Sequence, residues 1–346
     1  MKKIKTALLS YGMSGKVFHA PFLTLHSGFE LSGAWERSKH LIQLDYPEAE
    51  SFASLEEILA SDAELVVVNT PVDTHYEYAK KVLEAGKHAL VEKAFTTTAA
   101  EAENLRTLAL DRGLKLTVYQ NRRWDSDLKT VKAVLDEGVL GDIVEAEIRF
   151  DRYNPLLSPK AWKESANAGA GVLKDLGPHI IDQALYLFGY PEAVFADIRT
   201  LRENSQVDDN IDILLYYPDK RVRLHGGFFN KEQQPGFMLQ GRNGSFFKPR
   251  ADVQEDTLKT GAKPNLEDWG TEPEDKAGIL HAVVNGEAVR KTVPTLQGNY
   301  YGLFEGVYNA IREGAAEPVT AEDGLRVMQI IDAAIKSSEQ RQAVTL

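Results

Sequence analysis

Short apolar, β-branched runs alternate with longer segments of helical period over residues 1–121. A strand, a helix and a further strand form the unit of a parallel sheet, whose strands are almost continuously apolar because helices cover both faces. The expected strands are 4–10, 29–35, 65–70, 88–93 and 114–121, and the expected helices include 74–85 and 98–111. This pattern predicts an α/β domain on a doubly wound parallel sheet.

The pattern changes after residue 121. A helix is expected up to Glu137, and the strands that follow have few helices between them: 144–150, 193–201, 211–217 and 222–229. Pro218-Asp219 is a turn signal, so residues 211–229 are expected to form a hairpin. Apolar residues at helical spacing predict an amphipathic helix over 321–341. The sequence therefore predicts two domains, residues 1–121 and 122–346, the second of α+β class with a mostly antiparallel sheet.

The composition excludes several classes of protein. The chain has 40 Lys and Arg against 51 Asp and Glu, and the resulting net charge of -11 repels nucleic acid and anionic lipid. The absence of Cys excludes disulfides, thiolate catalysis, iron-sulfur clusters and Cys-type zinc sites. The apolar run after Lys5 is too short for a signal peptide, and no stretch approaches the roughly 18 apolar residues of a membrane span. We expect a cytoplasmic protein without nucleic-acid or membrane partners.

A glycine-containing turn follows the first expected strand and begins a helical segment. Gly12 and Gly15 occupy the two later glycine positions of the dinucleotide-binding pattern G-x-G-x-x-G, and Ser10 occupies the first. Taken alone, two glycines at this spacing fit a plain tight turn better. The second expected strand, however, ends about 20 residues later, where a nucleotide-binding domain carries the residue that contacts the ribose. This context favours the dinucleotide-binding interpretation.

The second strand ends in Glu36-Arg37-Ser38, and these residues bear on the choice of cofactor. Glu36 would favour the ribose diol of NAD, whereas the guanidinium fork of Arg37 would favour the 2′-phosphate of NADP. Neighbouring residues of a strand project in opposite directions, so one of the two is expected to face the nucleotide. Two solvated charges are the alternative. We expect Arg37 and Ser38 to bind NADP, with NAD as the weaker cofactor.

Polar residues also close two other strands of the first domain. Asn69-Thr70-Pro71 follow one strand and Glu92-Lys93 follow the next, and ligands of open α/β sheets bind outside these carboxyl ends. Lys93 closes a strand expected to be buried, which favours a binding role over that of a solvated surface cation. The expected cofactor-binding residues are Gly12, Met13, Ser14, Gly15, Arg37, Ser38, Asn69, Thr70, Pro71, His75, Glu92, Lys93 and Asn121.

Asp175 and His179 are the candidates for chemistry in the second domain. They lie four residues apart in a segment with Pro178 in the first turn of a helix, and that spacing can direct a carboxylate and an imidazole toward one place. A capping Asp and a packed His fit the sequence equally well. We expect no metal at His179 and Asp182, because no third and fourth ligand stand at a recognisable spacing.

Four further residues are candidates for the wall of a substrate pocket. Arg123 and Trp124 follow the last strand of the first domain, and Tyr153 and Trp162 are aromatic residues of the second. An ion-paired Arg and aromatic residues of the core are the alternatives. The expected substrate-binding residues are Lys93, Arg123, Trp124, Tyr153, Trp162, Asp175 and His179.

Three motifs together resemble those of the glucose-fructose oxidoreductase, inositol dehydrogenase and rhizopine-catabolism family, Gfo/Idh/MocA. They are GMSGKVFHAP at 12–21, VEK at 91–93 and DLGPH at 175–179. The tract VYQNRRWD at 118–125, with EDWG at 267–270 and GNY at 298–300, resembles the branch that contains NADP-dependent scyllo-inositol dehydrogenases. The resemblance spans nearly the whole chain.

This resemblance implies an N-terminal Rossmann domain and a C-terminal domain whose large open sheet commonly forms a subunit interface, hence a homodimer or homotetramer. It also implies hydride transfer between a nicotinamide and a carbon of a sugar or polyol, with Lys93, Asp175 and His179 at the catalytic positions. Ser10 replaces a glycine of the family pattern, and Ala94 replaces the Pro after Glu-Lys, which would loosen the strand end. We expect these departures to alter cofactor geometry or affinity before they abolish chemistry.

The expected protein is therefore an NADP-dependent dehydrogenase that acts on a secondary alcohol of a polyol or sugar similar to scyllo-inositol. Lys93 is expected to transfer the proton, His179 to assist, and Asp175 to orient the reacting hydroxyl or His179. One alternative is an aldose or dihydrodiol dehydrogenase that uses the same residues. Another is a non-catalytic, NADP-sensing regulator, against which the retention of all three residues argues.

Overall fold

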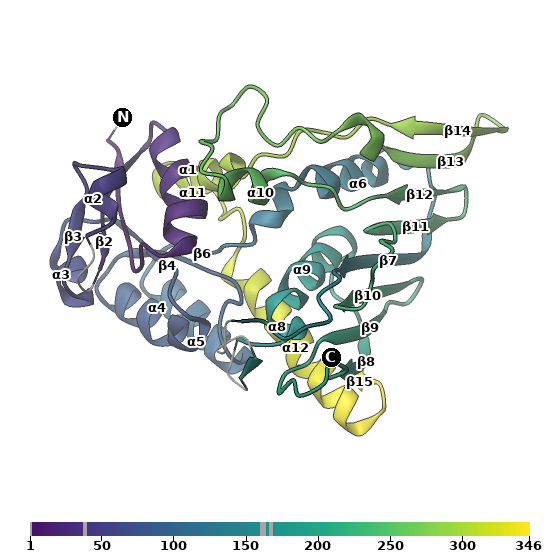
Figure 1. The fold of residues 1–346 in the computed structure, drawn as a ribbon, viewed down its shortest axis with the longest axis horizontal. Helices are drawn as coiled ribbons and strands as arrows, with labels where there is room; N and C mark the ends of the chain where they lie inside the picture. The colour runs from purple at the N-terminus through teal and green to yellow at the C-terminus, as the bar shows by residue number, and fades with distance from the viewer. Residues whose placement is uncertain (1, 37–39, 160–163, 166–168) are drawn as a thin grey trace. The chain divides into compact units, whose positions relative to one another are not determined.

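The computed structural model of the chain describes residues 2–36, 40–159, 164–165 and 169–346 (Figure 1). The chain divides into two compact units. Unit 1 consists of residues 1–121, 254–269 and 299–325, and unit 2 of residues 122–253, 270–298 and 326–346. The division expected from the sequence, at 121/122, differs from these units in two later segments that pack with the first. Nothing in their local sequence pattern distinguishes these segments from their neighbours in the second half.

Unit 1 is built on a six-stranded sheet of order β3-β2-β1-β4-β5-β6, in which every pair of neighbours is parallel. This order confirms the doubly wound Rossmann sheet. The sequence pattern missed only β3, whose three residues are too few to show a period. The strands are β1 (Ile4–Leu8), β2 (Phe29–Trp35), β3 (Glu50–Phe52), β4 (Leu65–Val68), β5 (His88–Val91) and β6 (Leu116–Val118).

The helices of unit 1 begin and end at recognisable signals. The Thr98 hydroxyl accepts a hydrogen bond from the Glu101 N–H at the start of α5, and Gly86 takes a φ of 76° after α4. Both helices lie where the sequence predicts them. The helices are α1 (Ala20–Leu25), α2 (Ile42–Asp45), α3 (Leu55–Ala60), α4 (His75–Glu84), α5 (Ala99–Asp111), α10 (Gln254–Lys259) and α11 (Tyr301–Glu313).

Unit 2 is built on a nine-stranded sheet of order β14-β13-β12-β11-β7-β10-β9-β8-β15. The pairing is antiparallel except between β7 and β10, and β9 and β10 form the expected hairpin. The sheet is therefore mixed but mostly antiparallel, as predicted. The strands are β7 (Ile143–Asp151), β8 (Ala193–Arg199), β9 (Asn210–Tyr216), β10 (Arg221–Gly227), β11 (Phe237–Gly241), β12 (Gly244–Lys248), β13 (Gly278–Val284), β14 (Glu287–Val293) and β15 (Val344–Thr345).

Helices cover one face of this sheet. Figure 1 shows α6 (Ser126–Asp136), α8 (Val172–Asp175) and α9 (Gly177–Phe188) on the same side of the strands. The expected closing helix is α12 (Ala321–Gln340), which passes from unit 1 to unit 2 after Leu325. Among the described residues, none of these helices combines the length and apolar character that a membrane span requires.

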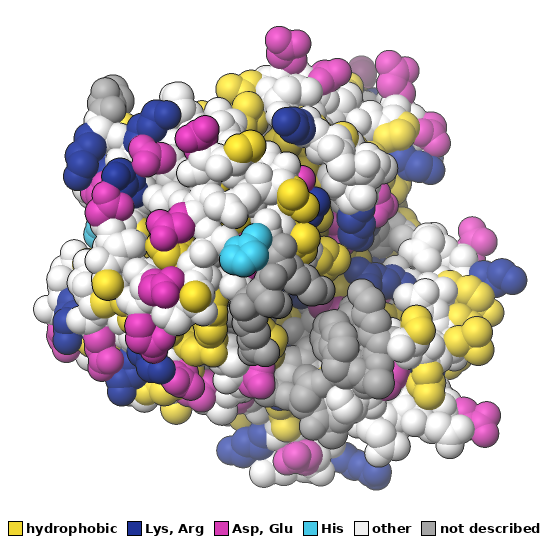
Figure 2. All heavy atoms as spheres, turned by 60° about the vertical axis from the view of Figure 1, so that its left-hand side comes forward, with side chains coloured by type: hydrophobic (Ala, Val, Ile, Leu, Met, Phe, Trp, Pro, Cys, Tyr) yellow, Lys and Arg dark blue, Asp and Glu magenta, His cyan; other side chains and the backbone are white. Residues whose placement is uncertain are grey.

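The opposite face of the unit 2 sheet carries a partly exposed apolar row. Phe247 pairs with Met238 on β11 and with Ile279 on β13, while the residues that follow or precede them in each strand point into the core. Figure 2 shows another aspect of the molecule, where acidic and basic side chains are interspersed over the atoms drawn in colour. Because its side chains are apolar and partly exposed, the row of Met238, Phe247 and Ile279 is a candidate for contact with a second copy of the chain.

We expect the protein to self-associate through the face that carries Met238, Phe247 and Ile279, because a second copy would remove these side chains from water. Sedimentation at micromolar concentration should give a dimer or tetramer. Phe247→Asp should shift the distribution toward monomer, since it places a charge in the interface, whereas Lys80→Asp on α4 should not. A monomeric wild-type protein would contradict this expectation.

Candidate functional site

The glycine turn of unit 1 is joined to the end of β4 by one side chain. The Asn69 Oδ1 atom accepts a hydrogen bond from the Ser10 N–H at 3.0 Å, and Asn69 Nδ2 donates to the Ser10 carbonyl oxygen at 2.8 Å. A Cβ atom at Gly15 would lie 2.2 Å from the same carbonyl oxygen, so only glycine fits there. The Gly12 N–H donates to Ser10 Oγ at 3.2 Å, which shows how the turn accommodates Ser10.

The Glu92 carboxylate joins the same turn to the end of β5. Its Oε1 accepts a hydrogen bond from the Ser14 hydroxyl at 2.5 Å and lies 2.9 Å from His19 Nε2, and its Oε2 accepts from the Lys93 N–H at 3.2 Å. Burial alone would raise the pKa of Glu92, but the hydrogen bonds from His19 and Ser14 and the charge of Lys93 lower it overall. Glu92 is therefore held as a carboxylate that supports the turn and the backbone at Lys93.

His19 was not singled out by the sequence analysis, although it lies within the first motif. Its ring is fully buried and packs against Tyr119, with the ring centroids 4.3 Å apart, and against Phe304, at 6.2 Å. Phe304 comes from α11, one of the later segments that complete unit 1. The role of His19 is to pair with the Glu92 carboxylate, and sequence reasoning missed it because the two residues lie 73 positions apart.

His75 connects the polar segments that follow β4 and β5. Its Nε2 atom lies 2.8 Å from the Thr70 carbonyl oxygen, and its Nδ1 atom lies 2.8 Å from the Ala94 carbonyl oxygen. Burial lowers the pKa of His75 although both contacts oppose this effect. Ala94, which replaces the Pro of the family motif, is buried, and its carbonyl oxygen lies beside the His75 ring. His75 therefore packs against the segment that follows Lys93.

Glu36, which follows β2, is one of the two charged residues expected to compete for contact with the ribose of the cofactor. The Glu36 carboxylate accepts hydrogen bonds from the Leu41 N–H at 2.8 Å and the Ile42 N–H at 3.0 Å, at the start of α2. Arg37 and Ser38 lie outside the described residues.

Within unit 1, the structure brings most of the predicted cofactor residues to one edge of the parallel sheet. Met13 is largely exposed, and Asn121 is buried where unit 1 passes into unit 2. The residues at or beyond the carboxyl ends of β1, β4 and β5 are Gly12, Met13, Ser14, Gly15, Asn69, Thr70, Pro71, His75, Glu92 and Lys93.

Arg123, predicted to bind substrate, forms an ion pair inside unit 2. Its Nε and Nη2 atoms donate to the two oxygens of Asp182 at 2.9 and 2.7 Å, and its guanidinium lies over the Tyr186 ring, 4.9 Å from the centroid. The surroundings of Arg123 are therefore those of the alternative interpretation, an arginine that is ion-paired within the protein. Among the described residues, no group of three or more His, Asp or Glu side chains is placed to hold a metal ion.

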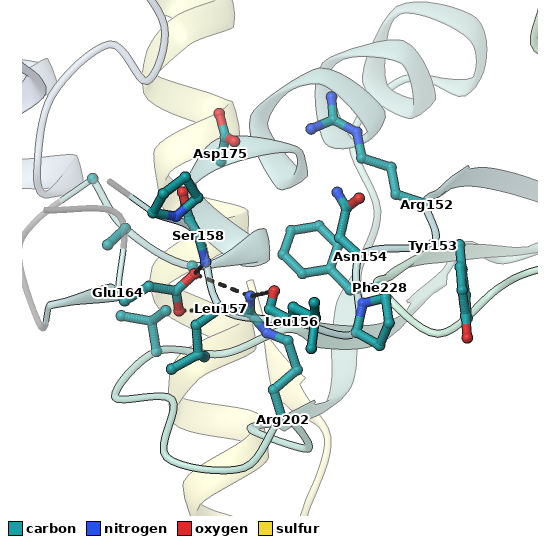
Figure 3. Close-up of a pocket in the computed structure, with 16 residues that line it drawn as sticks. Arg152, Tyr153, Asn154, Leu156, Leu157, Ser158, Glu164, Asp175, Arg202 and Phe228 are labelled. Carbon is teal, nitrogen blue, oxygen red and sulfur yellow. Dashed lines mark hydrogen bonds and ion pairs between the residues drawn. The ribbon is translucent and has the colours of Figure 1, made fainter. Parts of the chain in front are cut away.

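A cavity of about 620 Å³ lies within unit 2 (Figure 3). Of the predicted substrate residues, Asp175 at the end of α8 and the half-exposed Tyr153 line it. His179 is buried on α9 outside the described lining, and Trp162 lies outside the described residues. The lining consists of Arg152, Tyr153, Asn154, Pro155, Leu156, Leu157, Ser158, Pro159, Glu164, Gly169, Ala170, Gly171, Asp175, Arg202, Val207 and Phe228.

Arg202 holds one end of this cavity together. Its guanidinium donates to both oxygens of Glu164, at 3.0 and 2.9 Å, to Asp209 Oδ2 at 3.1 Å and to the Leu156 carbonyl oxygen at 3.3 Å. Burial would raise the pKa of Glu164, but the Ser158 N–H and Arg202 lower it overall. The three charged side chains form one network, in which Arg202 and Asp209 are buried and the Glu164 side chain is largely covered. Sequence reasoning missed Arg202, because its partners are remote in sequence and no local motif marks it.

Arg202→Met should destabilise the protein by about 3–5 kcal/mol, because the fully buried Asp209 and the largely covered Glu164 would both lose their cation. Urea unfolding should show this as a lower midpoint. The control is Arg223→Met, which breaks the ion pair between Arg223 on β10 and Asp212 on β9 of the unit 2 sheet. The Arg223 side chain is 45% exposed, so this loss should stay within about 1 kcal/mol. Equal losses in the two variants would contradict the role given to Arg202.

Both parts of the chain match models of one oxidoreductase family. Residues 4–120 match "Oxidoreductase family, NAD-binding Rossmann fold", and residues 132–346 match "Oxidoreductase family, C-terminal alpha/beta domain". Unit 1 thus contains an NAD-binding Rossmann domain, as its strand order indicates.

Several known proteins are similar over the full length. The scyllo-inositol 2-dehydrogenase (NADP(+)) IolW of Bacillus subtilis is 39% identical over 344 residues, which cover 99% of this chain and 96% of that protein. The uncharacterised oxidoreductase YdgJ of Escherichia coli is 36% identical and covers 99% of both chains.

Solved structures of oxidoreductases are also similar to this chain over its full length. The oxidoreductase YvaA of Bacillus subtilis has a TM-score of 0.96 at 38% identity and covers 100% of this chain and 99% of its own. An oxidoreductase of Bacteroides fragilis has a TM-score of 0.92 at 42% identity and covers 100% of both chains. The family models and these full-length relatives together show that the chain belongs to the Gfo/Idh/MocA family of oxidoreductases.

Proposed function

We propose that this oxidoreductase is NADP-dependent and transfers hydride between the nicotinamide and a secondary alcohol of a polyol or sugar, with scyllo-inositol as the first candidate. The observation that carries the proposal is the sheet edge of unit 1, where Glu92 joins the glycine turn to Lys93. The name of the relative from Bacillus subtilis supports the choice of polyol and cofactor.

The residues of the glycine turn fit a dinucleotide. A Cβ atom at Gly12 would meet only Ser10 Oγ, at 3.4 Å, so the absent side chain leaves open space beside the backbone. A pyrophosphate can approach a backbone of this kind closely. Residues 12–15 and Asn69 to Pro71 would hold the cofactor at this edge, and Arg37 and Ser38 would bind its 2′-phosphate.

Glu36 supports NADP over NAD. Its two carboxylate oxygens accept the Leu41 and Ile42 N–H groups, which orients the carboxylate toward the start of α2 and leaves it fewer lone pairs for a ribose diol. A diol needs an acceptor of this kind, whereas a 2′-phosphate is better matched by a guanidinium. We therefore assign the contact with the 2′-phosphate to Arg37.

The roles of the catalytic residues follow from the reaction. When bound, NADP supplies a hydride acceptor or donor, and the oxidised alcohol must lose its hydroxyl proton. Lys93 would bind the reacting oxygen and take that proton, and in the reverse reaction would return it. The Lys93 N–H is anchored on Glu92, which fixes the backbone from which this side chain extends. Asp175 would orient the substrate hydroxyls, and His179 would assist proton transfer.

Lys93→Ala should lower kcat by about 10²- to 10⁴-fold, the usual contribution of a general acid-base group. The Kd for NADPH should stay nearly unchanged, because the turn and Asn69 are intact. Turnover is measured by the absorbance of reduced nicotinamide with a panel of inositols and sugars, and Lys80→Ala on α4 is the control.

Two outcomes of this assay would count against the proposal. If Lys93→Ala kept most of the activity, His179 would become the leading base. Binding of NADPH by the wild-type protein without turnover of any polyol or sugar would instead favour the alternative of a non-catalytic, NADP-sensing regulator.

Arg37→Ala should lower kcat/KM with NADP by about 10- to 150-fold, because a charge-assisted contact with phosphate is worth about 1.5–3 kcal/mol. Activity with NAD should change little. The measurement is kcat/KM with each cofactor for both proteins. Equal values for NAD and NADP in the wild-type protein, or no loss with NADP in the variant, would contradict the preference.

A further inference from the structure

His19 is a buried, titratable side chain that has no part in the proposed proton or hydride transfer. Its Nε2 atom lies 2.9 Å from Glu92 Oε1. The second ring nitrogen, Nδ1, is also buried and has no hydrogen-bond partner among the described residues. The ring therefore acts on its polar surroundings through Glu92.

An irregular helical turn places the His19 ring against Glu92. Residues Gly15–His19 form a π-helical turn, and the Ala20 N–H donates to the Gly15 carbonyl oxygen across it. Turns of this kind are rare and frequently lie at functional sites. Pro21, in the first turn of α1, lacks the N–H that would bond the Val17 carbonyl oxygen in a regular α-helix. The sequence itself thus favours the irregular turn.

Aromatic residues enclose the His19 ring and fix its orientation. Tyr119 and Phe304 pack against it, and the Tyr119 hydroxyl donates to the Phe18 carbonyl oxygen at 3.0 Å. These surroundings would accept an apolar side chain of similar size. A leucine at this position would therefore remove the contact with Glu92 and, because Nδ1 has no described partner, would leave no other hydrogen bond of the ring broken.

Glu92 depends on His19 because it is buried. Burial is the largest influence on the pKa of Glu92 and raises it, and the contact with His19 is the largest influence that lowers it. The Ser14 hydroxyl and the charge of Lys93 lower it further. Without His19, the pKa of Glu92 should rise, so the carboxyl should take up a proton at a higher pH than in the wild-type protein.

His75, on α4, is the other histidine whose charge would act on Glu92. Its own pKa is lowered, chiefly by burial, so its ring is neutral near pH 7 and adds no positive charge there. Its two ring nitrogens lie against the Thr70 and Ala94 carbonyl oxygens. His75 therefore cannot take over the role of His19.

A protonated Glu92 would hold the sheet edge less well. As a carboxylate, it accepts from the Ser14 hydroxyl through Oε1 and from the Lys93 N–H through Oε2. Protonation turns one of these oxygens into a hydroxyl, which would face a donor already in place. One of the two links would weaken, and the glycine turn would no longer be tied to the backbone at Lys93.

We propose that His19 is a positioning residue of the cofactor site: by donating from Nε2 it keeps Glu92 ionised, and so holds the glycine turn and the Lys93 backbone together as the pH falls. The inference rests on the proposed function, because it takes NADP as the ligand of this edge. His19 contacts neither the cofactor nor the substrate in this role.

The test measures the Kd for NADP by calorimetry at pH 8 and pH 6, and compares His19→Leu with the wild-type protein. The ratio of the two Kd values should be close to one at pH 8, where Glu92 is a carboxylate in both proteins. It should rise about tenfold at pH 6, because only the variant loses the carboxylate as the pH falls. His19→Gln should remove most of this rise, since Gln also carries an N–H at the ε position.

His26→Leu is the matched control. His26 is a second buried histidine of unit 1, and its Nε2 atom lies 2.8 Å from Glu305 Oε2. It precedes β2, so it lies at the opposite edge of the parallel sheet from the glycine turn. The loss of this pair should leave the Kd ratio independent of pH. Near-native circular dichroism at both pH values is required of each variant.

The outcomes separate this inference from the proposed function. A Kd ratio for His19→Leu that does not change with pH, or one that changes equally in His19→Gln or His26→Leu, overturns the inference alone. The expected pH dependence without turnover of any polyol or sugar overturns the proposed reaction and supports the role of His19 in binding the cofactor. A wild-type protein that binds no NADP overturns both.

Discussion

The buried carboxylate of Glu92 is the constraint on which the nucleotide-binding edge of unit 1 depends. A buried charge is tolerated only where donors surround it, and here the donors are the Ser14 hydroxyl, His19 and the Lys93 N–H. These three groups come from the glycine turn, the segment after it and the end of β5. Satisfying one carboxylate therefore fixes the turn expected to hold pyrophosphate beside the lysine expected to transfer the proton.

Charge compensation organises unit 2 in a similar way. Arg123 is matched to Asp182, and Arg202 is matched to Glu164 and Asp209, so these side chains serve the structure of the unit. Arg152 stands in the same cavity as Arg202 and is supported by an aromatic ring in place of a carboxylate. The two arginines of this cavity therefore differ in how their charge is accommodated. Residue type alone does not make that distinction.

Local patterns predicted what depends on local sequence. Apolar period, capping residues and turn signals predicted every strand of unit 1 except β3, helices α4, α5 and α12, and the β9–β10 hairpin. The pattern missed features that depend on remote partners: the packing of residues 254–269 and 299–325 with unit 1, the pairing of His19 with Glu92, and the network around Arg202. The competition between Glu36 and Arg37 was also open in the sequence, because only the contacts of Glu36 with α2 show how that carboxylate is used.

The central claim is that this chain transfers hydride between NADP and a polyol carbon. Its most direct test is to incubate the protein with a keto-inositol and NADPH deuterated at nicotinamide C4, separately in each of the two C4 configurations, and to examine the product by mass spectrometry and NMR. The account predicts an inositol with one deuterium, from one of the two labelled cofactors, on the carbon that gains the hydroxyl. NADPH binding without deuterium in any inositol product would contradict it.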